Sequence, residues 1–137
     1  MSGRSTRRLT RAAPLAVSCL LLAAVAPAAT PISVSASPTT VSRGQKVTLR
    51  GSGWGVIEFC KPRVQLSLRR SPPLRPLVIA TVNLQTATKT SGTFGTSWTV
   101  PRTVSSGLRT IVATQHCESG KNGATVLITR STPIRVR

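Results

Sequence analysis

Residues 63–69, with the sequence RVQLSLR, contain the clearest structural signal in the chain, because polar and apolar residues alternate in strict order. Successive side chains of a β-strand point to opposite faces, so this period of two is typical of a strand with one buried face. The three apolar residues of the stretch would line that face. Arg63 and Arg69 share the opposite parity, and we expect both to point away from the core.

The same period of two continues on both sides of this stretch. Turn signals rich in Gly, Ser, Pro and Asn separate the alternating runs, and no window has helical spacing over three turns. Phe94 and Trp98 alternate on one face and are both expected in the core. About seven short strands predict an all-β antiparallel sandwich. The alternating or β-branched runs lie at residues 32–36, 47–49, 64–68, 78–84, 94–100, 108–117 and 124–129, with 134–136 closing the chain.

The N-terminal 28 residues have the pattern of a cleaved signal peptide. An apolar stretch at 14–26 is followed by the small residues of Ala26-Pro27-Ala28, which predicts cleavage before Ala29. The stretch has 13 residues, fewer than the about 20 that a membrane-spanning helix needs. We therefore expect a signal peptide at 1–28, a single domain at 29–137, no transmembrane segment in the mature form, and secretion by either the general or the twin-arginine route. Four arginines precede the apolar stretch: Arg4, Arg7, Arg8 and Arg11.

Two cysteines, Cys60 and Cys117, remain after such cleavage. In an oxidising compartment an even pair predicts a disulfide, which would close a loop of 57 residues and contribute roughly 4 kcal/mol. Two cysteines and the single histidine, His116, leave a structural zinc site one ligand short. We expect neither a metal site nor a cofactor.

The acidic residues are too few for most enzyme chemistry, since Glu58 and Glu118 are the only ones. Each lies within two positions of a cysteine, so the disulfide would bring both, and His116, to one end of the domain. Paired carboxylates are the arrangement of glycosidases, but pairing with neighbouring cations is the favoured interpretation in so basic a chain. No serine-hydrolase or metalloprotease motif occurs, and we expect no enzymatic activity.

Trp54 follows Gly-Ser-Gly near the same end of the domain. Two roles are open to it: stacking on a sugar or another flat ligand, or filling the end of the core. Candidate ligand contacts at this end are therefore Trp54, Glu58, His116 and Glu118.

The strongest compositional feature is charge, with 19 Lys and Arg against 2 acids. Removing the four leader arginines leaves 15 basic side chains, a net charge of +13. Five cations come from one short stretch, so we expect them close together on a basic face. Such a face suits anionic cell-envelope polymer or polysaccharide; the alternative is that the charge serves solubility alone. The export signal and the absence of Tyr argue against a dedicated nucleic-acid reader. The five candidates are Lys61, Arg63, Arg69, Arg70 and Arg75.

Residues 32–55, ISVSASPTTVSRGQKVTLRGSGWG, resemble the opening of bacterial secreted immunoglobulin-like domains. Three later segments fit the same pattern: SGTFGTSWTVP at 91–101, VSSGLRTIVA at 104–113 and ATVLI at 124–128. The resemblance implies an immunoglobulin-like β-sandwich with a structural or adhesive role. In that fold the strand that starts near residue 63 neighbours the strand that ends at 117, which places Cys60 beside Cys117 at the end carrying the B–C and F–G loops.

The segment GQKV at 44–47, with a cysteine soon after, resembles a second family, the enediyne apoproteins. That resemblance implies the alternative function: a small-ligand carrier with a cleft between the B–C and F–G loops, near Trp54. These carriers have two disulfides where this chain can form one. The leading expectation is a secreted, non-enzymatic, cell-surface module that binds anionic polymer, and its oligomeric state stays open.

Overall fold

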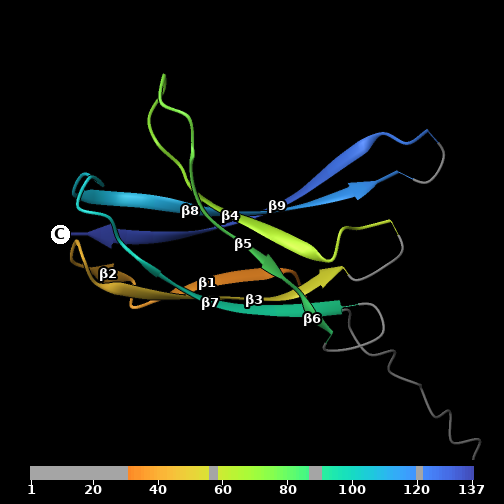
Figure 1. The fold of residues 1–137 in the computed structure, drawn as a ribbon, viewed down its shortest axis with the longest axis horizontal. Helices are drawn as coiled ribbons and strands as arrows, with labels where there is room; N and C mark the ends of the chain where they lie inside the picture. Colours follow the sequence, from red (N-terminus) through yellow and green to blue (C-terminus); the bar gives the residue numbers. More distant parts are fainter. Residues whose placement is uncertain (1–30, 56–58, 87–90, 120–121) are drawn as a thin grey trace, which may run out of the picture.

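The structure is a computed structural model that describes residues 31–55, 59–86, 91–119 and 122–137. The expected signal peptide at 1–28 lies outside the described residues, which contain nine strands (Figure 1). No helix among them is long and apolar enough to cross a membrane. The strands are β1 (Ser33–Ser37), β2 (Thr40–Val41), β3 (Lys46–Gly55), β4 (Arg63–Leu68), β5 (Leu77–Asn83), β6 (Gln85–Thr86), β7 (Ser91–Thr99), β8 (Gly107–Glu118) and β9 (Thr125–Val136).

The strands form two sheets, which lie as two layers in Figure 1. The four-stranded sheet has the order β1-β3-β7-β6, and the five-stranded sheet has the order β2-β9-β8-β4-β5. All strand pairs are antiparallel except β2 with β9. The predicted all-β class is therefore confirmed. The expected runs at 124–129 and 134–136 form a single strand, and β2 and β6 are two-residue strands that no sequence pattern indicated.

The alternation in the sequence becomes the core between the two sheets. The apolar residues of β4 are buried, and its polar residues are exposed or half-buried, as the stretch 63–69 predicted. Burying one Val or Leu side chain stabilises a fold by about 1.5–3 kcal/mol, so one shared core holds the layers together. Both sheets contribute to this core, which includes Val47, Leu49, Trp54, Val64, Leu66, Leu68, Phe94, Ile111, Ala113 and Ile134.

A β-bulge in β3 decides where Trp54 points. Odd-numbered residues of β3 face inward as far as Gly51, so simple alternation would place Trp54 on the outer face. The register with β7 shifts between Gly51 and Trp54, and Gly53 has a φ of 73°, a left-handed conformation that glycine adopts without strain. The extra residue turns the indole inward. Trp54 is fully buried, and its Nε1 donates a hydrogen bond to the carbonyl of Ser33 at 3.0 Å.

Gly51 leaves the space that the two core aromatic rings occupy. A Cβ atom at this position would overlap the ring of Phe94, its partner on β7, and would lie 2.7 Å from Nε1 of Trp54. The two rings pack at a tilt of 50° with their centroids 6.1 Å apart. Trp98, which we expected in the core, is only partly buried. β6 pairs with Gly92 and Thr93, and no strand of the described residues pairs with β7 at Trp98 on that side, so the indole lies beside an open edge.

Candidate functional site

The disulfide fixes one end of the five-stranded sheet. Cys60 and Cys117 are bonded with their Cα atoms 4.0 Å apart, which confirms the predicted bridge. β4 and β8 are antiparallel neighbours, so the start of one lies beside the end of the other. The backbone N–H of Lys61 donates to the carbonyl of His116 at 2.9 Å. The cysteines therefore anchor the segment that carries the first two candidate cations.

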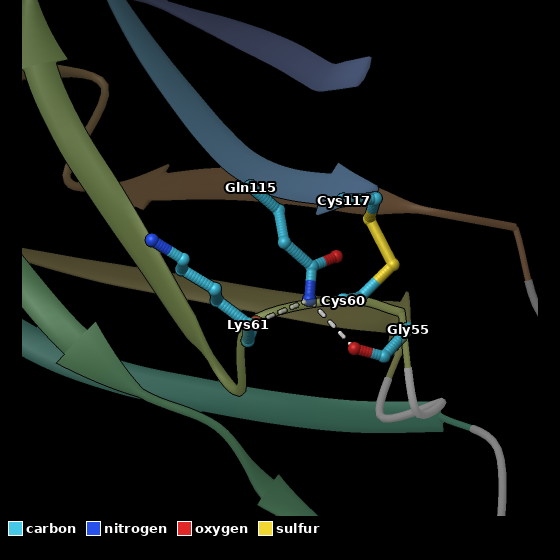
Figure 2. Close-up of a disulfide and its surroundings, with 5 residues drawn as sticks. All are labelled: Gly55, Cys60, Lys61, Gln115 and Cys117. Atoms are coloured by element: carbon cyan, nitrogen blue, oxygen red, sulfur yellow. Dashed lines mark hydrogen bonds between the residues drawn. A yellow bond between two sulfur atoms is a disulfide. The ribbon is translucent and has the colours of Figure 1, made fainter. Parts of the chain in front are cut away.

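Gln115 reinforces this anchor from inside the fold (Figure 2). Its side chain is fully buried, and its Nε2 donates to the carbonyl of Gly55 at 2.6 Å and to that of Lys61 at 2.9 Å. One amide thus joins β8 to the end of β3 and to the segment that enters β4. Sequence reasoning did not single out this residue. The sequence did contain a signal that could have identified it. In the run 108–117, Gln115 is a polar residue at the same inward parity as Ala113 and Cys117, both of which are buried.

A hollow on the outer face of the five-stranded sheet lies next to the bridge, and we call it the disulfide-end hollow. Its volume is about 310 Å³. Three strands contribute to it, because Gln65 pairs with Thr81 on β5 and with Thr114 on β8. A lysine, an arginine and a histidine therefore lie beside neutral hydrogen-bonding groups. The lining residues are Lys61, Arg63, Gln65, Thr81, Thr114 and His116.

A second hollow, the β4–β5 hollow, lies at the other end of β4 and has a volume of about 290 Å³. The segment between β4 and β5 rises away from the layers there (Figure 1). Nε of Arg70 donates to the carbonyl of Arg75 at 2.7 Å, which ties this segment together. The guanidinium of Arg109 donates to the carbonyl of Ser106 at 3.0 Å and to other groups of the same turn, so it holds the entry into β8. The hollow is lined by Arg69, Arg70, Ser71, Pro72, Leu108, Arg109 and Thr110.

The prediction that the five candidate cations lie close together on one face is wrong in one respect. Lys61 and Arg63 lie at the disulfide end, whereas Arg69 and Arg70 lie at the opposite end of β4. A strand rises about 3.3 Å per residue, so six steps from Arg63 to Arg69 span about 20 Å. Proximity in sequence does not bring them together, because an extended strand separates its ends as far as a chain can.

The four candidate ligand contacts have different surroundings. Trp54 is buried, which corrects its proposed role as a stacking surface and leaves the role of filling the end of the core. Glu58 lies outside the described residues. His116 and Glu118 are exposed at the disulfide end, where both line a small hollow of about 50 Å³ with Lys61. This small hollow and the disulfide-end hollow are lined mostly by polar and charged side chains.

No protein-family model matches this chain, and no curated protein matches it in sequence. Among solved structures it is similar to a ceramidase complexed with C2, with 13% identity, a TM-score of 0.47, and coverage of 78% of this chain and 19% of the other. It is also similar to Spo0M, a sporulation control protein from Bacillus subtilis, with 14% identity, a TM-score of 0.48, and coverage of 77% and 48%. A third likeness is to a chain from a structure that describes T cell specificity and activation by the bacterial superantigen toxic shock syndrome toxin-1, with 15% identity, a TM-score of 0.43, and coverage of 78% and 100%. The chain spans less than half the length of the first two. None of these likenesses bears on its function.

Proposed function

We propose that this protein is a secreted, non-enzymatic immunoglobulin-like module that associates with anionic polymers of the cell surface. The strand orders support the immunoglobulin-like assignment. β1-β3-β7-β6 corresponds to the order A-B-E-D, and β9-β8-β4 to the order G-F-C of such domains. The disulfide and the leader-like segment support export, because disulfides persist in oxidising compartments.

The observation that carries the proposal is the presence of two cationic ends on the five-stranded sheet. Glu118 is the only acidic side chain in the described part of the chain, so most of the cations there have no carboxylate to pair with. The strand between the ends presents neutral groups, among them Gln65 and Ser67. An extended polyanion could lie along β4 and meet both ends. A compact anion could meet only one.

Binding to isolated cell envelope across a salt series tests this proposal. The variant Arg63→Gln/Arg69→Gln/Arg70→Gln removes three charges from the two ends. It should bind more weakly and with a flatter salt dependence, because fewer counterions are released on binding. Its stability should barely change, since exposed charges contribute little.

The matched control, Arg43→Gln/Arg50→Gln/Arg102→Gln, removes three exposed charges elsewhere and should bind nearly as the unmodified protein does. An equal loss in both variants would mean that net charge alone drives association. Unchanged binding in the first variant would show that the two ends are only a hydrated surface, and the small-ligand carrier would become the better hypothesis.

A further inference from the structure

We infer that the disulfide-end hollow binds one acidic sugar unit of an anionic polysaccharide, with the acid group on the cations and the hydroxyl groups on the neutral side chains. This inference rests on the proposed function and narrows its ligand from any polyanion to a carbohydrate. The acid group can be a carboxylate, a sulfate or a phosphate, since all three suit the same donors.

The charged part of the hollow is held in place and is free to bind. Gln115 and His116 fix the backbone of Lys61, whose side chain extends away from the disulfide and from Gln115 (Figure 2). The side chains of Lys61 and Arg63 form no hydrogen bond or ion pair with the described part of the protein. An Arg guanidinium presents a planar fork of donors that matches an oxyanion, and the pairing of Arg63 with Asn83 on β5 fixes the backbone that carries it.

The neutral part of the hollow favours a sugar over an inorganic anion. Gln65, Thr81 and Thr114 form a row across three neighbouring strands, and none of their side chains has a hydrogen-bond partner among the described residues. A fully ionised inorganic anion such as sulfate can accept from this row but has no hydroxyl group to donate to its oxygen atoms, so it uses the row only in part. Amide and hydroxyl groups both donate and accept hydrogen bonds, as the hydroxyl groups of a sugar do.

The other hollows lack this combination. The β4–β5 hollow has arginines, but Pro72 and Leu108 form part of its wall, and Arg109 is already engaged by its own turn. A hollow of about 410 Å³ on the outer face of the four-stranded sheet has Ser, Thr and Gln side chains but a single cation, Arg50. The disulfide-end hollow, at about 310 Å³, is at the lower limit of ligand sites and suits one sugar unit.

The test compares three probes: a uronic-acid oligosaccharide, its carboxyl-reduced neutral counterpart of equal length, and inorganic sulfate. The variant Gln65→Ala/Thr81→Val/Thr114→Val removes the neutral row and keeps the cations. We expect about tenfold weaker binding of the uronic-acid oligosaccharide, with an unchanged salt dependence and a smaller loss for sulfate, which makes fewer hydrogen bonds to the row. Arg63→Gln should weaken binding and also flatten its salt dependence.

The matched control carries one Gln→Ala and two Thr→Val substitutions, as the first variant does, but on the outer face of the four-stranded sheet: Thr48→Val/Gln85→Ala/Thr93→Val. It should bind as the unmodified protein does. If the first variant also binds the oligosaccharide as the control does, the inference is overturned while the proposed function stands. If the unmodified protein binds no polyanion in a salt-dependent way, the proposed function itself fails.

A second measurement protects the test against a variant that does not fold. Titrating the unmodified protein with the uronic-acid oligosaccharide should shift the amide resonances of Arg63, Gln65, Thr114 and His116. Shifts confined to residues around Arg69 and Arg70 would place the sugar in the other hollow and contradict the inference.

Discussion

Gln115 is the residue on which the candidate site most depends, although it touches no surface. Its Nε2 donates to two backbone carbonyls, one on Gly55 and one on Lys61, whereas its Oε1 is buried and accepts no hydrogen bond from the described residues. An unsatisfied buried polar group costs about 1–3 kcal/mol. The side chain therefore contributes to stability and also positions the backbone beneath the disulfide-end hollow.

Replacing this amide gives a pH-dependent prediction. Gln115→Glu places a carboxylate against two carbonyl oxygens, and burial raises the pKa of this new Glu above its unfolded value. The variant should therefore gain stability as the pH falls towards 4 and lose it as the pH rises through the folded-state pKa. Gln115→Met removes both donated hydrogen bonds but also the unpartnered Oε1, so it should cost about 1–3 kcal/mol at every pH. Denaturant unfolding between pH 4 and 7 measures both. Parallel pH profiles for the two variants would contradict the hydrogen-bonding role of Gln115.

The sequence was a limited guide to which way two core side chains point, those of Gln115 and Trp54. The buried position of Gln115 was not predicted, although the sequence held the signal for it: Ala113 and Cys117 share its face in the run 108–117. The direction of Trp54 could not be fixed from alternation, since it depends on a bulge two residues long. Gly-Ser-Gly before Trp54 signals a turn or a bulge with equal weight, and only the pairing with β7 decides between them.

At the scale of elements, alternation predicted the strands that have one buried face. β4 begins and ends within one residue of the expected run, and β8 contains all of its expected run. β9 joins the expected runs at 124–129 and 134–136 into one strand and passes through Pro133, a residue type that normally interrupts a strand. β2 pairs only with Arg135 and Val136, so β9 has an open edge at Pro133, where a strand tolerates proline. The two-residue strands β2 and β6 are too short to have a period.

The bridge between the entry into β4 and the end of β8 leads to a prediction about stability. Cys60→Ser, Cys117→Ser and the double variant should each lower the free energy of unfolding by about 2–5 kcal/mol. The three values should be nearly equal, because the same bond is lost each time. Denaturant unfolding measures them, and thiol titration of the native protein should find neither cysteine free. Two reactive thiols, or a double variant far less stable than either single one, would contradict this account.

At the scale of the whole molecule, the sequence predicted the amount of charge but not its arrangement. The composition identified a chain with 19 basic residues, and alternation placed Arg63 and Arg69 on the outer side of a strand. Their separation into two ends follows from the length of β4. The disulfide-end hollow was harder to predict, because Thr81, Thr114 and His116 join it through strand pairing between segments far apart in the chain.

The central claim is that one extended polyanion contacts both ends of β4, about 20 Å apart. A double-mutant cycle between Arg63→Gln and Arg69→Gln/Arg70→Gln, measured with oligosaccharides of increasing length, tests it most directly. Chains too short to span the distance should bind either end, with no coupling between the two substitutions. Chains long enough to span it should bind at least about tenfold more tightly, because the second contact becomes intramolecular, and the substitutions should become coupled. An affinity that rises smoothly with length and shows no coupling at any length would contradict the claim.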